Sequence, residues 1–137
     1  MKKTSVVVSL FVVFALLVAC GQTAGEITVL TVGGQEYSQT DLETLGTMSV
    51  DYTDKDGETT TYEGVLLADL LKDAGVDDDG DTVTFKAGDG YIADMPMADA
   101  LACTDCIVAF DDDSLRTVMP EQSGKLQVKD VVEISGN

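Results

Sequence analysis

The sequence predicts a mixed α+β fold, a compact mixed β-sheet or barrel with flanking short helices. Many short segments alternate apolar and polar residues with the period of two that strands show. Glycine- and aspartate-rich turns separate these segments. Two or three other segments repeat apolar residues at the spacing of an amphipathic helix. The chain has 137 residues without an internal repeat or a long linker, so we expect one globular domain after the leader.

Turn residues mark where the expected strands begin and end. Gly33-Gly34 and Asp56-Gly57 are typical of hairpin turns, and Gly88-Asp89-Gly90 reverses the chain once more. In chain order, the expected strands are Glu26–Val32, Gln35–Tyr37, Thr47–Tyr52, Glu58–Tyr62, Thr82–Ala87, Tyr91–Met95, Ile107–Phe110, Leu115–Met119 and Gln127–Ile134.

Three short helices are expected between these strands. Thr40 and Glu43 fit a capping box, which predicts a helix that ends before Gly46. The clearest helix is Val65–Ala74, because its leucines fall on one face. A proline can open a third helix over Pro96–Leu101.

The first residues predict a signal peptide. Lys2 and Lys3 supply a positive start, and an apolar run from Val6 to Ala19 follows. This run is about 14 residues long, whereas a bilayer-spanning helix needs roughly 20. A positive start and a short apolar run that ends in small residues are typical of a secretory signal. We therefore expect an exported protein.

The signal ends in Leu17-Val18-Ala19-Cys20, which resembles the lipobox of bacterial lipoproteins. The resemblance implies that residues 1–19 are removed and that Cys20 becomes the lipidated N-terminus. Two or more acyl chains hold a soluble domain stably at a membrane. Residues 20–25 are then a short tether, and residues 26–137 are an extracytoplasmic domain anchored to the cell membrane or outer membrane.

The charge is strongly negative, with 25 acidic residues, 8 basic residues and a formal net charge of −17. Loss of Lys2 and Lys3 with the signal makes the mature chain still more acidic. A surface this acidic repels phosphates, which excludes nucleic acid as a partner. Solubility or salt tolerance is the simplest consequence of the charge.

Two classes of active site are also disfavoured. The chain has no histidine, which excludes a Ser–His or Cys–His catalytic pair and removes a common metal ligand. The acidic loop Asp77–Asp81 resembles the start of an EF-hand, which needs Gly at its sixth position and Glu at its twelfth. Thr82 and Gly88 occupy those positions, so we expect a solvated turn and no metal site.

Cys103-Thr104-Asp105-Cys106 forms a C-x-x-C motif. Outside the cytoplasm such a pair usually closes as a structural disulfide; a redox-active pair and half of a metal site are the alternatives. Thioredoxin-like pairs begin a helix, whereas this pair follows the helix expected to end at Leu101. Asp105 disfavours a thiolate beside it, and a zinc site lacks its histidines or second cysteine pair.

A series of motifs is similar to the molybdopterin-binding domain of the sulfite-oxidase-like oxidoreductases. In order, they are Tyr62–Leu71 (YEGVLLADLL), Ala74–Val76 (AGV), Val83–Phe85 (VTF), Asp89–Tyr91 (DGY), Leu115–Pro120 (LRTVMP) and Val128–Lys129 (VK). The resemblance covers roughly residues 26–135. It implies the compact mixed fold of that family and an ancestral ligand, the molybdopterin cofactor with its phosphate.

The resemblance also implies an anion site. In the family an Arg before the late Pro and a Lys in the terminal V-K hold the cofactor's anionic group, and Arg116 and Lys129 stand at the matching places. Arg can bind a phosphate through two hydrogen bonds, and Lys binds it as a point charge. The turn formed by Asp89, Gly90 and Tyr91 is expected to line the same site. Alternatively, both cations pair with surface carboxylates.

The chain departs from the family pattern at the metal ligand. The family binds its metal through a Cys in the first half, whereas the corresponding stretch, Met48–Asp54, has none. Asp112-Asp113 stands in place of the usual His-Gly, and Asp130 in place of the usual Trp. Because the family's redox chemistry belongs to the metal cofactor, we assign no catalytic residue and expect no cofactor, with molybdopterin as the option that the resemblance offers.

Two main functions follow as alternatives. The first is a non-catalytic binding module for a small anionic ligand or an envelope protein partner. The second is an oxidoreductase or electron-transfer accessory that uses molybdopterin or the pair Cys103 and Cys106. A purely structural envelope protein is a third alternative.

Overall fold

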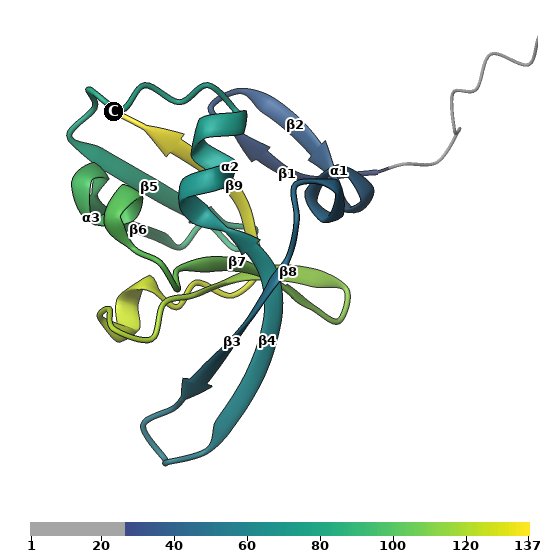
Figure 1. Cartoon of the computed structure of the whole chain (residues 1–137), viewed down its shortest axis with the longest axis vertical. Coiled ribbons are helices and arrows are strands. Elements are labelled where there is room, and N and C mark those ends of the chain that lie inside the picture. The colour runs from purple at the N-terminus through teal and green to yellow at the C-terminus, as the bar shows by residue number, and fades with distance from the viewer. Residues whose placement is uncertain (1–26) are drawn as a thin grey trace, which may run out of the picture.

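The computed structural model describes residues 27–137 (Figure 1). The predicted signal peptide, Cys20 and the tether lie outside these residues. The strands are β1 (Thr28–Val32), β2 (Gln35–Ser38), β3 (Met48–Thr53), β4 (Thr59–Leu66), β5 (Thr82–Ala87), β6 (Ile92–Pro96), β7 (Ile107–Asp111), β8 (Ser114–Val118) and β9 (Val131–Gly136). The helices are α1 (Gln39–Thr44), α2 (Leu67–Asp73), α3 (Met97–Ala102) and the short 3₁₀-helix η1 (Gly124–Leu126).

The first sheet has five strands in the order β2-β1-β9-β5-β6. Neighbouring strands are antiparallel except β1 and β9, which are parallel. Apolar side chains of α2 and α3 share one core with this sheet, including the fully buried Phe85, Ile134, Leu70 and Met97. Removal of these side chains from water is the main source of the domain's stability.

The second sheet has four antiparallel strands in the order β3-β4-β7-β8. In Figure 1 the β3–β4 hairpin projects away from the rest of the domain. A small second apolar cluster on this sheet contains Val50, Ile107, Ala109 and Val118. The sheet therefore has a small core of its own, beside the hairpin that positions the site described below.

Gly64 of β4 pairs with a strand on each side, with Met48 of β3 and with Ala109 of β7. A Cβ atom at Gly64 would overlap the carbonyl oxygen of Val108. Only glycine permits this close approach of two backbones. The glycine in the YEGV segment is thus a packing requirement of the fold.

The α+β class is confirmed, whereas the barrel alternative is wrong for the described residues. Both sheets are open, since β2 and β6 end the first and β3 and β8 end the second. The predicted strand Thr82–Ala87 matches β5 at both ends. The other predicted strands and helices are present, with shifted ends in several cases.

The predicted helix Val65–Ala74 begins too early, because Val65 and Leu66 pair with β7 as the end of β4. The predicted strand Gln127–Ile134 also begins too early. Asp130 has a φ of 55°, which breaks the extended chain before β9.

The predicted capping box at Thr40 is wrong by two residues. Ser38 is the N-cap of α1, and its side chain accepts a hydrogen bond from the backbone N–H of Asp41. The Asp41 carboxylate accepts one from the backbone N–H of Ser38 in return. Asp41, a shorter acidic residue, therefore closes the capping box in place of the predicted Glu43.

Within residues 27–137, every helix is too short or too polar to cross a bilayer.

Candidate functional site

The site is built around Arg116, the one arginine of the chain. Arg116 lies in β8 and is only 8% exposed, and the next residue, Thr117, is fully buried. Buried polar side chains need partners, because an unpaired one costs about 1–3 kcal/mol or more. The buried side chains of Arg116 and Thr117 in β8 therefore need hydrogen-bond partners inside the fold.

Tyr62 of β4 is the main partner of Arg116. The Arg116 guanidinium donates a hydrogen bond to the Tyr62 hydroxyl at 3.0 Å and lies 4.7 Å from the centre of the Tyr62 ring. Asp111 is 3.8 Å from the same guanidinium nitrogen, beyond hydrogen-bond distance. The Nε atom of Arg116 is buried and has no hydrogen-bond partner among the described residues. The arginine is held in place, yet one of its donors is unused.

Thr117 fixes the chain that runs past Arg116. Its hydroxyl donates to the carbonyl of Leu126 and accepts from the N–H of Val128 at 2.7 Å. The side chain of Gln127 in turn bonds both backbone groups of Met119. These bonds hold the segment after η1 against β8.

The same segment brings Lys129 to Arg116. The two residues form an isolated antiparallel β-bridge, so their backbones lie side by side. Arg116 and Lys129, which the sequence resemblance selected as an anion site, are therefore adjacent in the fold. Within residues 27–137 the ion pair of Arg116 and Asp111 is the only one, so Lys129 is not paired with a carboxylate.

Both cations line a cavity of about 420 Å³ between the β3–β4 hairpin and the segment after η1. Its other lining residues are Tyr52, Asp54, Lys55, Glu58, Thr60, Tyr62, Gly124 and Gln127. Three cations thus face two carboxylates in a chain whose net charge is −17. Like charges gathered at one place cost free energy unless counter-charges join them, so this cavity favours an anion.

Another cavity of about 430 Å³ has the opposite character. Asp112, Asp113 and Asp130 line it together with apolar side chains such as Phe110 and Leu115. Among its described lining residues none is basic. Its chemistry is unsuited to an anion, and the cation-lined cavity is the better site.

The turn of Asp89, Gly90 and Tyr91 does not line the cation-lined cavity. It joins β5 and β6 of the first sheet, and the Tyr91 hydroxyl donates to the backbone carbonyl of Lys125. The turn still lies near the segment that carries Lys129, because the backbone N–H of Gly88 donates to the carbonyl of Asp130.

Sequence reasoning missed Lys55, Tyr52 and Tyr62 as lining residues. Tyr62 belongs to the YEGV segment, whose motif alone predicts no role in binding. Lys55 lies in a hairpin turn, where an exposed lysine gives no signal by itself. The alternation of β3 and β4 does give a signal for Tyr52. Tyr52 pairs with Thr60, which also lines the cavity.

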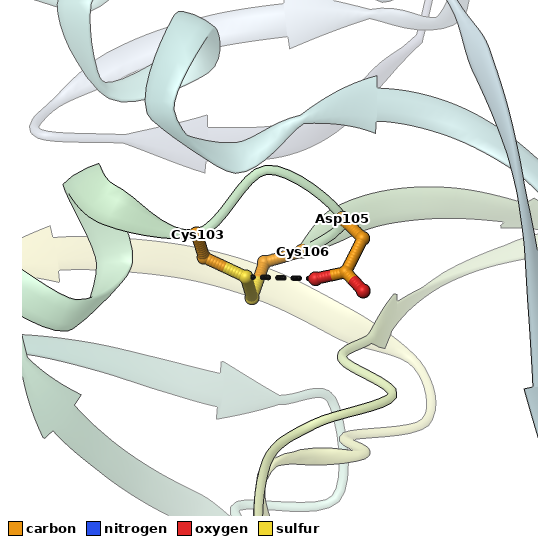
Figure 2. Close-up of side chains that lie close together, drawn as sticks. All are labelled: Cys103, Asp105 and Cys106. Carbon is orange, nitrogen blue, oxygen red and sulfur yellow. Dashed lines mark hydrogen bonds between the residues drawn. A yellow bond between two sulfur atoms is a disulfide. The ribbon is translucent and has the colours of Figure 1, made fainter.

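The second group predicted from sequence is the C-x-x-C pair. Cys103 and Cys106 are joined in a disulfide between α3 and β7. Figure 2 shows Asp105 beside them, with its Oδ1 atom 3.2 Å from the Sγ of Cys103. A disulfide sulfur carries no hydrogen, so this contact is a hydrogen bond only after reduction. The acidic loop at Asp77–Asp79 is fully exposed and forms a local turn.

Fold and cavity together define a small α+β domain with a cation-lined cleft on its second sheet. The family model of the oxidoreductase molybdopterin-binding domain matches residues 21–136, so the chain belongs to this family. Among solved structures, the sulfane dehydrogenase SoxCD of Paracoccus pantotrophus is similar with a TM-score of 0.64 at 18% identity. The match covers 80% of this chain but only 37% of that one. No curated protein matches the chain.

The family implies a molybdopterin cofactor, and the cavity fits it in part. Lys55, Arg116 and Lys129 suit the anionic end of such a group, and the buried Nε of Arg116 has no hydrogen-bond partner among the described residues. The donor set does not suit the metal. None of the described lining residues is a cysteine, and Cys103 and Cys106 lie elsewhere in a disulfide. The stretch expected to hold the family's thiolate supplies Tyr52 and Asp54 to this wall instead.

Proposed function

We propose that this chain is a membrane-anchored, extracytoplasmic binding module that holds a small anion in the cation-lined cavity and performs no catalysis. One observation carries the proposal: the buried Arg116 retains an unpaired Nε donor next to Lys129 in a cavity with a surplus of cations. An oxyanion that enters the cavity satisfies this donor and neutralises the cations.

The absence of catalysis is argued from the donor set. The described lining residues include tyrosine, lysine, arginine and two carboxylates, and the chain has no histidine. No thiolate is available among these residues to hold a redox metal. The remaining groups bind and orient an anion, which is what a module for ligand capture or for presentation to an envelope partner requires.

Anchoring rests on the lipobox-like sequence that ends at Cys20. Cys20→Ala removes the sulfur to which the lipid attaches. We expect the wild-type chain to sediment with membranes and to gain the mass of its acyl chains, and the variant to do neither. An unmodified Cys20 in the wild-type mature chain would contradict the anchoring.

Anion binding is tested by calorimetric titration of the full chain with inorganic phosphate. Arg116→Met keeps an apolar stem and removes the charged guanidinium, and we expect it to weaken binding at least about tenfold, since a charged hydrogen bond contributes about 1.5–3 kcal/mol. Lys86→Gln removes an equal charge from the exposed face of β5 and serves as the matched control. Equal affinity in the Arg116 variant and the wild type would contradict the proposal.

A second candidate, an oxidoreductase that retains molybdopterin, is favoured by the family alone. The full chain is produced in a host that makes the cofactor and is assayed for molybdenum and for the fluorescent oxidised pterin. We expect neither at a stoichiometric level. Near-stoichiometric cofactor would replace the binding module with an oxidoreductase whose metal has a ligand other than cysteine.

A further inference from the structure

The two cysteines of the disulfide between Cys103 and Cys106 differ in their exposure. Cys106 is fully buried within the main core, whereas Cys103 is partly exposed. An open hollow of about 290 Å³ lies beside Cys103, and Cys106 is not among its described lining residues. A group that approaches from solvent therefore meets Cys103.

The hollow is acidic. Its lining residues besides Cys103 are Asp99, Ala102, Thr104, Asp105, Glu121 and Gln122. Three carboxylates thus line the hollow beside Cys103, and no basic side chain is among its described lining residues. Figure 2 shows Asp105 beside the disulfide, with its Oδ1 atom 3.2 Å from the Sγ of Cys103. None of these residues lines the anion cavity, so the two sites are separate.

Carboxylates beside a disulfide affect which thiolates can reach it. A disulfide opens when a thiolate attacks one sulfur and the other leaves. The incoming group is an anion, so the carboxylates repel it, and positive charge on the attacking molecule offsets that repulsion. Selection by charge and attack at one sulfur both follow from the same geometry.

We propose that Cys103–Cys106 is a thiol–disulfide exchange site that accepts electrons at Cys103 from a dithiol on a positively charged protein and resists anionic thiols. The partner's first thiolate bonds to Cys103 and breaks the Cys103–Cys106 bond, and Cys106 leaves as a thiolate that takes up a proton. The partner's second thiolate then attacks the partner sulfur of the mixed disulfide and expels Cys103, which is also protonated. The partner loses two electrons and becomes a disulfide, and this chain gains two thiols.

Asp105 acts again in the reduced state. The Cys103 thiol has a proton to donate to Asp105 across the contact of 3.2 Å. This bond stabilises the thiol over the thiolate and slows reoxidation. Asp105 thereby acts twice. It repels anionic reductants, and it slows the reoxidation of the two thiols.

The test uses the full chain and two synthetic dithiol peptides of equal length, one with lysines and one with glutamates beside its cysteines. Reduction is followed by acid quench, alkylation and mass spectrometry, with rates expressed per thiolate. At low salt we expect the lysine peptide to react at least about tenfold faster. The trapped mixed disulfide is expected at Cys103. At 1 M salt, where screening acts over about 3 Å, we expect the two rates to converge.

Variants assign the selectivity to the hollow. Asp105→Asn combined with Glu121→Gln should reduce the ratio of the two rates at least about threefold, because two of the three carboxylates lose their charge. Glu36→Gln, an exposed site on β2, should leave the ratio unchanged. Equal rates for the two peptides at low salt, a mixed disulfide at Cys106, or a pair that no peptide reduces while the chain stays folded would each overturn the proposal.

Discussion

The five-stranded and four-stranded sheets differ in what they bury. The first packs large apolar side chains such as Phe85 against α2 and α3. The second has a small apolar cluster around Val50, and its strand β8 buries Arg116 and Thr117. Complete apolar packing stabilises a fold but offers nothing to a polar ligand. The second sheet also contributes Val65, Val108 and Leu115 to the main core, but it alone combines apolar packing with the buried Arg116 and Thr117.

The comparison is tested most strongly by cavity-forming substitutions in both cores. Phe85→Ala in the first sheet should lower the free energy of unfolding by about 4 kcal/mol. Val50→Ala in the second should lower it by about 1.5 kcal/mol, since two methyl groups are lost from a smaller cluster. Urea unfolding of the full chain measures both. Equal losses would show that the two cores contribute alike.

Gly64→Ala tests the junction of β4 with β7. The new Cβ would collide with the Val108 carbonyl, and overpacking of this kind costs about 3 kcal/mol. Gly57→Ala is a control with open space around it, although its φ of 84° adds some strain. The midpoint of thermal unfolding should fall much further for Gly64→Ala, and a similar fall for both would refute the close-approach argument.

Thr117→Val sharpens the comparison by leaving the shape of β8 intact. The N–H of Val128 loses its buried acceptor, so we expect a loss of about 2 kcal/mol in stability. Because Thr117 holds the segment that positions Lys129, phosphate affinity should fall as well. Lost stability with unchanged affinity would separate Thr117 from the site.

The smallest effect is expected at the first helix. Hydrogen bonds from the backbone and hydroxyl of Ser38 hold the pKa of Asp41 below its usual value. A depressed pKa in the folded state means that the stabilisation is present above the unfolded pKa, near 4, and is lost as pH falls through the folded pKa. Asp41→Asn should reduce stability slightly at pH 7 and flatten its decline in acid. An unchanged acid profile in urea unfolding would contradict this.

Local patterns in the sequence were sufficient to predict the fold class and most elements. The alternation of Thr82–Ala87 needed no tertiary information. The start of α2 could not be predicted without tertiary information. Val65 and Leu66 also fit the apolar face of a helix, and only their pairing with β7 makes them part of a strand. The break at Asp130 was hidden for a similar reason, since a left-handed aspartate is not visible in an otherwise strand-like segment.

The site was predictable only where a family motif marked it. Arg116 and Lys129 were selected from motifs, and the fold places them side by side. Lys55 and Tyr52 come from the β3–β4 hairpin, whose position over β8 depends on long-range packing. The motif that contains the Asp89–Tyr91 turn carries no information on distances, so it predicts the turn in the same cleft. In the fold this turn joins β5 and β6 of the first sheet.

The central claim is that the unused Nε–H of Arg116 receives an anion. Since Arg116 is the one arginine of the chain, nitrogen-edited NMR of the full chain in detergent gives a single arginine Nε–H signal. We predict that this signal shifts in a saturable manner as inorganic phosphate is added, while Lys86→Gln leaves the titration unchanged. A signal that stays fixed throughout the titration would contradict the account.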